Sequence, residues 1–492
     1  MLSSDSALAR LISERAADAP GHPLLEDARS DRVVTAADLE RLVAAWHARF
    51  ADAGLGASAA VLIDVDDPLA IAVLQLAAIS GGYRAVTIDR GAGREEPERI
   101  AGLIRGAGMT VGDRGADRAV VGAPWTAVGP GLLPGATANG IPAPGAEPAG
   151  TGAAVLFTSG STGAPKGVEL PEPQLLFVAE RIARHHGLRP NDRGFNPLPL
   201  SHVNPQVVGV LATLVAGATV VLDARFRRTG FWELLHERRI TWLNAVPAIL
   251  AVLARTGELD PPEGLRFIRC ASAPLPDHVR EAFAGIPVIL SWGMTEGASQ
   301  ITATDPQDAA TVSGVGRPQG SEVEVRAPGG AERLAGQTGE LWVRGPGIVT
   351  HYLFGAAADR FDADGWLRTG DVGTVDGNGL VALAGRSDDV INRGGEKVYP
   401  ADVEEVLLGD PAVLEAVVVA RPDEILGQVP VAYVIPVEGA AIDIDRLRER
   451  CEELARFKRP VEIDVVPDLP RAPAGKIRRA EVRRMAEEAA TR

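Results

Sequence analysis

Cysteine is scarce in this chain of 492 residues, which contains only Cys270 and Cys451. Two cysteines so far apart argue against a disulfide framework and against a cysteine-based zinc site. The amino-terminal stretch Met-Leu-Ser-Ser-Asp-Ser also lacks the basic start and the apolar core of a signal peptide. We therefore expect the protein to work in the cytoplasm.

The chain also lacks a long hydrophobic run and an excess of basic residues. Its longest apolar stretch, residues 207–222, includes two glycines and is short for a membrane span, so it predicts a buried helix followed by a strand. Acidic residues outnumber basic ones by 65 to 50, which leaves a net charge of −15. That balance argues against general binding to nucleic acid or to anionic membranes. We expect a monomer or homodimer without a membrane span.

Hydrophobic patterning predicts an α/β architecture for the first two thirds of the chain. A protein of this length exceeds what one core supports, so two or more domains are expected. Strands that alternate with amphipathic helices predict parallel sheets covered by helices. The predicted helices are 35–50 and 68–79, and the predicted strands are 60–65, 85–88, 219–222, 266–270 and 288–290. Residues 128–152 are rich in Gly, Pro and Ala without periodicity and are expected to form a loop.

The pattern changes in the last third of the chain. From about residue 312, short segments interrupted by glycine, such as 340–344 and 380–384, predict an antiparallel sheet or a small barrel. After Arg386 the sequence predicts a compact α+β unit. Its expected elements are helices at 401–408 and 444–455, strands at 414–420 and 430–435, and a basic C-terminal helix.

Residues 156–168, Leu-Phe-Thr-Ser-Gly-Ser-Thr-Gly-Ala-Pro-Lys-Gly-Val, are the most informative run in the chain. An apolar strand over 153–157 leads into a loop whose glycines, Gly160 and Gly163, let the backbone approach a phosphate closely. Lys166 and four hydroxyl side chains complete a concave anion site. These hydroxyl residues are Thr158, Ser159, Ser161 and Thr162. A Walker A loop requires Ser or Thr after its lysine, whereas Gly follows Lys166, so this loop is of another type.

The run resembles the phosphate loop of the adenylate-forming superfamily, which includes acyl-CoA synthetases, carrier-protein adenylation domains and beetle luciferases. Further motifs in the same order extend the resemblance from about residue 30 to about residue 480. It implies a large N-terminal domain, residues 1–387, of two α/β sheet subdomains plus a small β-barrel. A small mobile α+β C-terminal domain, residues 388–492, is expected to follow.

Residues 291–296, Ser-Trp-Gly-Met-Thr-Glu, form the second motif. They follow an apolar strand, and open α/β sheets bind ligands at the carboxyl ends of their strands. Mg²⁺ takes few protein carboxylates and keeps water and phosphate oxygens, so Glu296 alone suffices as its ligand. Thr295 is expected to bind the α-phosphate, and Trp292, where the family usually has Tyr, offers a flat face to adenine. The resemblance adds Ala273, Pro274, Gly293 and Met294 to the nucleotide site.

The third motif joins Thr369-Gly370-Asp371 with Gly385-Arg386-Ser387-Asp388-Asp389. Asp371 can accept both ribose hydroxyls, as acidic residues do in dinucleotide folds, and Arg386 can donate from the other side. The resemblance makes Asp388 the hinge about which the C-terminal domain rotates. It also places four residues along the pantetheine tunnel of CoA ligases: Gly394, Gly395, Glu396 and Lys397.

The fourth motif, residues 469–479, carries Lys476 on a loop marked by prolines and glycine. By composition alone, Lys476 belongs to a solvated basic patch. The resemblance instead makes it a catalytic lysine that stabilises the negative charge of the adenylation transition state.

His202 matches a histidine that lies beside the substrate carboxylate in acyl- and aryl-CoA ligases, whereas His185 and His186 are expected at the surface. Small residues at 297–299 suggest an acyl pocket that includes His202, Gly297 and Ala298, with room for a bulky or cyclic acyl group. No aromatic–Asp signature follows Asn196, which disfavours an α-amino acid as substrate.

These observations predict an AMP-forming carboxylate–CoA ligase that uses ATP, Mg²⁺ and coenzyme A. The acid would first be activated as acyl-AMP with release of pyrophosphate, and the acyl group would then pass to the CoA thiol. Two alternatives stay open. One is an enzyme that loads the thiol of an acyl carrier protein, and the other is a catalytically silent homologue that only binds.

Overall fold

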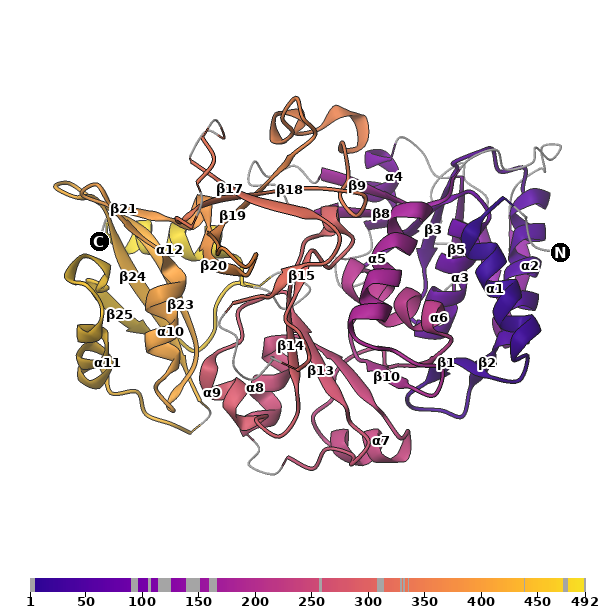
Figure 1. Ribbon diagram of the computed structural model, residues 1–492, viewed down its shortest axis with the longest axis horizontal. Helices are drawn as coiled ribbons and strands as arrows, with labels where there is room; N and C mark the ends of the chain where they lie inside the picture. The colour runs from indigo at the N-terminus through magenta and orange to yellow at the C-terminus, as the bar shows by residue number, and fades with distance from the viewer. Residues whose placement is uncertain are drawn as a thin grey trace. The chain divides into compact units, whose positions relative to one another are not determined.

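The computed structural model describes most of the chain, and its residues fall into two units (Figure 1). One unit contains Met1–Pro274, Phe283–Glu322 and Val343–Leu367, and the other contains Leu275–Ala282, Val323–Trp342 and Arg368–Arg492. The described residues are 5–89, 96–104, 108–113, 125–138, 151–158, 166–255, 259–307, 314–327, 330, 332–334, 336–437, 439–471 and 477–490. Within them, no helix is long and apolar enough to cross a membrane.

A seven-stranded sheet in the first unit has the order β7-β6-β5-β3-β4-β8-β9. Its central strands are parallel, whereas β7 and β9 pair antiparallel with their neighbours at the two edges. The strands are β3 (Ala60–Asp64), β4 (Arg84–Thr87), β5 (Met109–Gly112), β6 (Trp125–Val128), β7 (Pro134–Ala138), β8 (Ala153–Thr158) and β9 (Lys166–Pro171). The parallel α/β arrangement predicted for this part of the chain is confirmed.

Strands β6 and β7 correct the prediction of a loop over residues 128–152. Backbone pairing of Trp125 with Ala138 and of Thr126 with Thr137 builds a hairpin on the edge of the sheet. The second strand, Pro-Gly-Ala-Thr-Ala, carries no alternating pattern of apolar residues. Sheet pairing with a neighbour therefore overrides weak local propensity. Residues 139–150 lie outside the described part.

A nine-stranded sheet, also in the first unit, has the order β16-β15-β14-β13-β12-β10-β11-β1-β2. The strands are β1 (Pro23–Asp27), β2 (Val33–Thr35), β10 (Arg193–Asn196), β11 (Thr219–Leu222), β12 (Trp242–Ala245), β13 (Phe267–Ala271), β14 (Val288–Trp292), β15 (Thr302–Ala303) and β16 (Arg317–Pro318). Strands β14, β13, β12, β10, β11 and β1, which follow one another in this order, run parallel, which places their carboxyl ends along one edge.

Helices pack against each other between these sheets, with contacts of α3 to α2 and of α1 to both α3 and α5 (Figure 1). Helix α3 is buried on every side, which explains why its sequence is apolar throughout. Thr35 and Asp38 form a capping box at the start of α2. The helices of this unit are α1 (Ala7–Asp18), α2 (Ala36–Asp52), α3 (Pro68–Ser80), α4 (Glu96–Leu103), α5 (Glu172–His185), the π-helix η4 (Pro205–Leu211), α6 (Ala212–Ala216), α7 (Phe231–Glu237) and α8 (Pro247–Arg255).

The last third of the chain builds two smaller sheets. One has the order β17-β18-β19-β20, and the other consists of β22-β21-β24-β23 with β25 paired to β24. The strands are β17 (Glu322–Arg326), β18 (Gly339–Arg344), β19 (Leu367–Val375), β20 (Val381–Arg386), β21 (Ile391–Arg393), β22 (Glu396–Val398), β23 (Val413–Asp423), β24 (Gly427–Pro436) and β25 (Glu462–Val465). The helices of the second unit are α9 (Asp277–Ala282), from the middle of the chain, α10 (Pro400–Leu408), α11 (Ile444–Arg450) and α12 (Arg479–Ala490).

Helix α11 ends earlier than the predicted 444–455. After Arg450 the chain makes a 3₁₀ turn over Cys451–Glu453, and Leu454 is extended. Two consecutive acidic residues, Glu452 and Glu453, follow the helix, where the helix dipole disfavours negative charge. The other elements predicted for the α+β unit are confirmed.

Candidate functional site

Strands β8 and β9 form a hairpin whose tip carries the predicted phosphate loop. Thr158 and Lys166 are its last register pair, so the two ends of the loop lie opposite each other. The Lys166 ammonium is 5.7 Å from the centre of the Tyr352 ring. The loop residues between them lie outside the described part: Ser159, Gly160, Ser161, Thr162 and Gly163. The hairpin therefore delivers a lysine and a threonine to the base of this loop.

Glu296 is buried, with 4% of its surface exposed. Its Oε1 accepts a hydrogen bond of 2.6 Å from the Tyr352 hydroxyl and lies 3.4 Å from Nη1 of Arg360. The same Arg360 nitrogen donates to the Tyr352 hydroxyl oxygen at 2.7 Å. Among the described residues, the Glu296 carboxylate is thus held in place through Oε1 alone, which leaves Oε2 for another partner.

This donor set suits Mg²⁺ better than a metal that needs a cage of protein ligands. Among the described residues, no group of three or more His, Cys, Asp and Glu side chains comes together. A magnesium ion is commonly bound through one or two carboxylates and completes its shell with water and phosphate oxygens. Oε2 of Glu296, to which no described residue is bonded, fits that requirement.

The turn that presents Glu296 is tight and locally strained. The backbone carbonyl of Ser299 folds back so closely that a Cβ on Gly293 would lie 1.8 Å from it. Ala298 and Ser299 both have positive φ, +48° and +87°, in the region that favours glycine. Ser272, which follows β13 at the same edge of the sheet, has φ +84°. Strained backbone of this kind clusters at functional sites. No sequence motif had indicated the strain at these residues.

Close packing explains the glycine at position 297. A Cβ there would lie 2.7 Å from the Ile301 side chain, with Ile348 also within contact distance. The space where a Cβ would stand is therefore filled, and this packing alone accounts for the glycine. Its place in the acyl pocket, with that of Ala298, stays a prediction.

The residues predicted to surround adenine differ in exposure. Trp292 ends β14 and is buried, with 5% of its surface exposed, whereas Ala273 and Pro274 are exposed just beyond β13. Gly293, Met294 and Thr295 are half-buried in the turn before Glu296. All of them lie at the carboxyl ends of neighbouring parallel strands, where open α/β sheets bind ligands.

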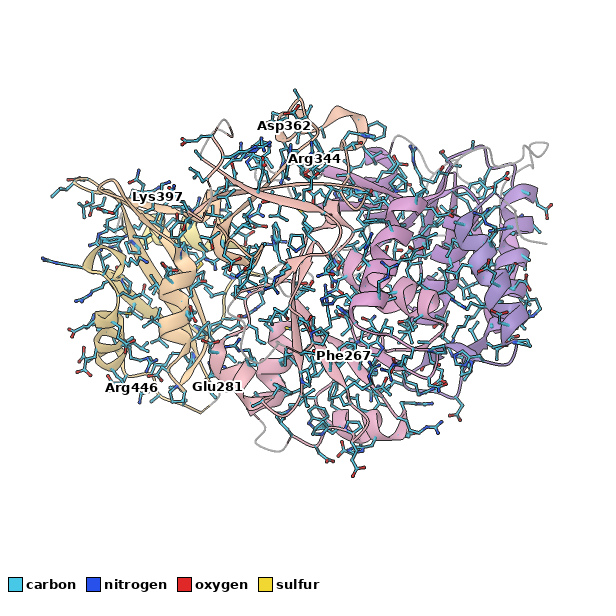
Figure 2. The ribbon with its side chains drawn as sticks, viewed as in Figure 1. Phe267, Glu281, Arg344, Asp362, Lys397 and Arg446 are labelled. Atoms are coloured by element: carbon cyan, nitrogen blue, oxygen red, sulfur yellow. The ribbon has the colours of Figure 1, made fainter. Side chains whose placement is uncertain are left out.

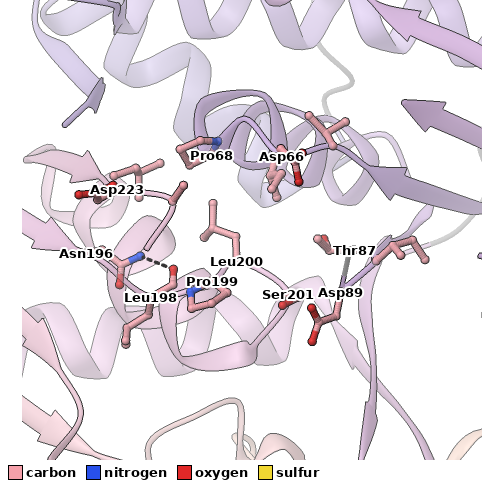
Figure 3. A pocket seen from close by; sticks show the side chains of 15 residues that line it. Asp66, Pro68, Thr87, Asp89, Asn196, Leu198, Pro199, Leu200, Ser201 and Asp223 are labelled. Atoms are coloured by element: carbon pink, nitrogen blue, oxygen red, sulfur yellow. Dashed lines mark hydrogen bonds between the residues drawn. The ribbon is translucent and has the colours of Figure 1, made fainter. Parts of the chain in front are cut away.

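A pocket opens at the carboxyl ends of strands from both large sheets (Figure 3). Asp66 follows β3, Asp89 follows β4, and Asp223 follows β11, so three carboxylates line it. Figure 3 shows Asn196, which ends β10, donating to the backbone oxygen of Leu198. The sequence had pointed to the segment 198–204 only through His202, and the pocket itself was not predicted.

His202 directly follows Ser201, which lines this pocket. Its imidazole keeps an exposed surface, but surrounding protein atoms displace water and lower its pKa, while the charge of Asp89 partly opposes that shift. A lowered pKa favours the neutral ring at neutral pH, so His202 can offer one donor and one acceptor there.

The prediction that His186 lies at the surface is wrong. This residue follows α5 and is buried, with 2% of its surface exposed, and its ring packs edge-on against Phe267. The amphipathic pattern of the helix could not reveal this, because the covering strand, β13, lies about eighty residues later in the chain. His185 is half-buried.

In the second unit, Asp371 and Arg386 form a register pair on β19 and β20. Nη1 of Arg386 donates to Oδ1 of Asp371 at 2.7 Å. Burial lowers the pKa of Arg386, but Asp371 and two further aspartates outweigh this effect and raise it above its usual value. The pair that was predicted to hold ribose is therefore brought together, with the two groups bonded to each other.

Asp388 lies in a 3₁₀ turn, Ser387–Asp389, directly after β20. Its backbone oxygen accepts a hydrogen bond of 3.0 Å from Nη2 of Arg483, a residue of α12. The same nitrogen donates to the Asp389 carboxylate at 3.1 Å. The predicted hinge is thus anchored through its main chain by the C-terminal helix.

Gly394 and Gly395 form the two-residue turn between β21 and β22. Both have positive φ, +61° and +96°, as a type I′ hairpin turn requires. The turn alone accounts for both glycines, and their role in a pantetheine tunnel stays a prediction. Glu396 and Lys397 are exposed on the second strand of this hairpin, and Figure 2 labels Lys397.

Lys476 and the four residues before it lie outside the described part. The segments on either side of them are joined, because Arg471 and Ile477 form an antiparallel bridge. Arg471 is also held by the Glu415 carboxylate at 2.9 Å. The base of the loop that carries Lys476 is therefore closed.

Comparison with known proteins adds independent findings. The family model of AMP-binding enzymes matches residues 12–353, and that of the AMP-binding enzyme C-terminal domain matches residues 402–476. Sulfoacetate–CoA ligase of Cupriavidus necator is 40% identical over 338 residues, which make up 67% of this chain and 66% of that protein. The chain thus spans slightly less than two thirds of this relative's length.

Solved structures resemble the whole fold. The o-succinylbenzoate CoA synthetase from Bacillus subtilis, in complex with its acyl-adenylate intermediate, has a TM-score of 0.83 at 27% identity, covering 96% of this chain and 97% of that one. An amide bond synthetase from Marinactinospora thermotolerans has a TM-score of 0.84 at 28% identity, covering 97% and 99%. The similarity extends over both units of the chain.

Proposed function

Since the chain belongs to the AMP-binding enzyme family, we propose that it is an ATP-dependent carboxylate–CoA ligase. In the first half-reaction, a carboxylate oxygen attacks the α-phosphorus of ATP, the bond from that phosphorus to the bridging oxygen breaks, and pyrophosphate leaves. In the second, the CoA sulfur attacks the acyl carbon of acyl-AMP, AMP leaves, and the thiol proton passes to solvent.

The buried Glu296 in the turn after β14, with Lys166 of the β8–β9 hairpin beside the Tyr352 ring that binds it, is the observation that carries this proposal. A phosphate loop, a lysine and a metal-binding carboxylate meet the needs of a triphosphate substrate. Glu296 would hold Mg²⁺, which neutralises charge on the phosphates. Tyr352 and Arg360 orient its carboxylate through the bonds described above.

The remaining roles follow the resemblance. Thr158 and the loop after it bind the β- and γ-phosphates, Thr295 binds the α-phosphate, and Asp371 with Arg386 binds the ribose. Lys476 stabilises the adenylation transition state. Rotation of the C-terminal domain, residues 388–492, about Asp388 then removes Lys476 and admits CoA along the segment 394–397. Motions of this type are common in enzymes with two half-reactions.

The acceptor is the least constrained part of the proposal. Adenylation ends at acyl-AMP, and the same intermediate can react with CoA, with a carrier-protein thiol or with an amine. We favour CoA because the relative from Cupriavidus necator is named a CoA ligase. The cytoplasmic location and a monomeric or homodimeric state stay predictions.

Acid-dependent release of pyrophosphate tests the proposal directly. Purified protein with MgATP and a panel of carboxylic acids should release pyrophosphate only when an accepted acid is present. Addition of CoA should then yield the thioester, identified by mass spectrometry. If thioester forms only with a holo-carrier protein, that carrier protein, and not CoA, is the acceptor. A protein that binds ATP but shows neither pyrophosphate release nor ATP–pyrophosphate exchange with any acid would be a silent homologue.

A further inference from the structure

Arg269 is a fully buried arginine whose hydrogen-bonding capacity is mostly unused. It lies in the middle of β13, with 0% of its surface exposed. Its Nη2 donates to the Ser291 hydroxyl at 3.1 Å, whereas Nε and Nη1 have no partner among the described residues. Buried charges are normally paired, because leaving one unpaired is costly. This arginine therefore lacks the anion that its environment requires.

No carboxylate of the described residues compensates the charge. Burial lowers the pKa of Arg269 to about 10, and the only opposing influence comes from Cys270, whose own thiol pKa is raised by burial to about 12. At neutral pH the guanidinium is therefore charged and the thiol is neutral. The buried face around Arg269 carries a net positive charge.

The described neighbours of Arg269 also have unpaired polar atoms and offer it no negative charge. The Ser291 hydroxyl donates to Oε1 of Gln300 at 3.2 Å, which leaves Nε2 of Gln300 without a partner. Ring nitrogen Nε2 of His186 is also unpaired. Burial, together with the charges of His185 and Arg269, holds the pKa of His186 well below its usual value. Within the described part of the chain, Arg269 and Gln300 are both bonded to Ser291 and keep unused N–H groups, while Oδ1 of Asn244 on the neighbouring strand is a neutral acceptor that is also unused.

The location connects this cluster to the nucleotide site within the same unit. Ser291 immediately precedes Trp292 and the turn that presents Glu296, and Gln300 follows that turn. In the parallel register, Arg269 pairs with Asn244 of β12, whose amide donates to Asn196 and Asn204. Polar side chains on neighbouring strands therefore lead from Arg269 through Asn244 to Asn204, in the segment that carries His202.

We propose that Arg269, Ser291 and Gln300 bind a second anionic group of the carboxylic acid, a carboxylate or a sulfonate, distal to the carboxylate that is adenylated. A guanidinium binds such oxyanions through two parallel hydrogen bonds, and Arg269 has two unused nitrogens for them. The Gln300 amide adds a neutral donor, and the Ser291 hydroxyl can turn its proton from Gln300 to the anion. An acid with a purely apolar tail would leave Nε and Nη1 of Arg269 and Nε2 of Gln300 unpaired. The inference rests on the proposed function, because it names the class of acid.

Pairs of acids that differ in the second anion provide the test: acetate against sulfoacetate, and butyrate against succinate. Pyrophosphate release gives kcat/KM for each acid, and the ratio within a pair measures selectivity. The wild type should favour at least one dianionic acid. In Arg269→Met that ratio should fall by about 30-fold or more, as expected when one partner of a buried charge pair is removed.

Two further variants separate binding from folding. Arg266→Met removes an arginine just before β13, one that is paired with Asp192 at 2.5 Å outside the cluster, and it should leave the selectivity ratio unchanged. Gln300→Leu removes one neutral donor and should lower the ratio less than Arg269→Met does. Thermal shift without ATP provides a readout besides activity. The favoured dianionic acid should raise the Tm of the wild type, and this increase should vanish in Arg269→Met.

The outcomes distinguish this inference from the proposed function. Equal use of both members of every acid pair would overturn the inference, and so would an Arg269→Met variant with unchanged selectivity and an unchanged thermal shift. In both cases acid-dependent pyrophosphate release would still support the ligase. No release with any acid would overturn the ligase and the inference together.

Discussion

At the scale of single residues, the neighbours of Glu296 shape its chemistry. A buried carboxylate is costly unless it is bonded, and within the described part of the chain Tyr352 and Arg360 provide those bonds, both through Oε1. The other oxygen is available to a cation, while the partly neutralising arginine prevents the site from being strongly negative before ATP arrives. Glu296 is therefore oriented in advance for a metal that enters with a nucleotide.

Replacing Glu296 with Gln should abolish adenylation without unfolding the protein. The amide keeps the side-chain volume and can still accept from Tyr352, but it removes the anionic ligand of Mg²⁺. Acid-dependent pyrophosphate release should fall by about 100-fold or more. Glu340→Gln is a matched control, because Glu340 is equally buried and paired with Arg368 at 2.9 Å in the other unit. Near-normal turnover of Glu296→Gln at saturating Mg²⁺ would contradict the metal-binding role.

Residue types in short motifs could be predicted, whereas their partners could not. Lys166, Glu296 and Asp371 stand in runs that resemble known motifs. Tyr352 binds Glu296 from 56 residues away and belongs to no motif. The positive φ of Ser272 is likewise invisible in a sequence of ordinary residues. Such features arise from tertiary packing, which local patterns do not encode.

At the scale of helices and strands, burial decided which predictions succeeded. Strands such as β3 and β13 are buried along their whole length, so they read as apolar runs and were predicted within one or two residues. The N-terminal strands β1 and β2 were not predicted to join the second large sheet. There β1 pairs in parallel with β11, almost two hundred residues later, and Arg15 of α1 donates to the backbone oxygens of Leu214 and Val215.

The turn at Asp388 offers a test at this scale. Proline fixes φ near −65° and disfavours the helical conformation that Ser387 has in this 3₁₀ turn. Asp388→Pro should therefore hold the hinge in one state, so that acyl-AMP formation survives while thioester formation falls by a much larger factor. The two steps are measured as pyrophosphate release and as thioester produced from synthetic acyl-AMP and CoA.

Asp388→Ala is the control, because it removes the carboxylate but leaves the backbone free and keeps the carbonyl that accepts from Arg483. Its two half-reactions should decline together or not at all. Equal losses of both steps in Asp388→Pro, or no loss of either, would show that residue 388 is not the hinge.

At the scale of the whole molecule, the division into two units parallels the proposed division of labour. Lys166, His202 and Glu296 belong to one unit, whereas Asp371, Asp388 and the loop before Ile477 belong to the other. The second unit also takes in residues 368–387, which the sequence assigned to the N-terminal domain. The two units are defined by which residues pack together, whereas the predicted boundary at 388 is the point about which a domain would rotate. The units therefore do not test that boundary, which stays a prediction.

Lys476→Ala tests the rotation most directly. If Lys476 stabilises the adenylation transition state and then leaves, its removal should harm only the first half-reaction. Loss of one preorganised charge typically costs a factor of about 10² to 10³, so pyrophosphate release should fall by that amount. Synthetic acyl-AMP and CoA should still yield thioester at a rate close to that of the wild type.

The variant should also remain folded, because the base of its loop is closed by the bridge between Arg471 and Ile477 and by the bond from the Arg478 amide to the Pro470 oxygen. Arg478→Ala is a suitable control, since it removes a neighbouring positive charge that is exposed and paired with Glu481 at 2.8 Å. It should leave both half-reactions nearly intact. If Lys476→Ala lowers both rates equally, Lys476 either serves both states or supports the fold. The hypothesis that the C-terminal domain rotates between adenylation and thioester formation would then have to be abandoned for this protein.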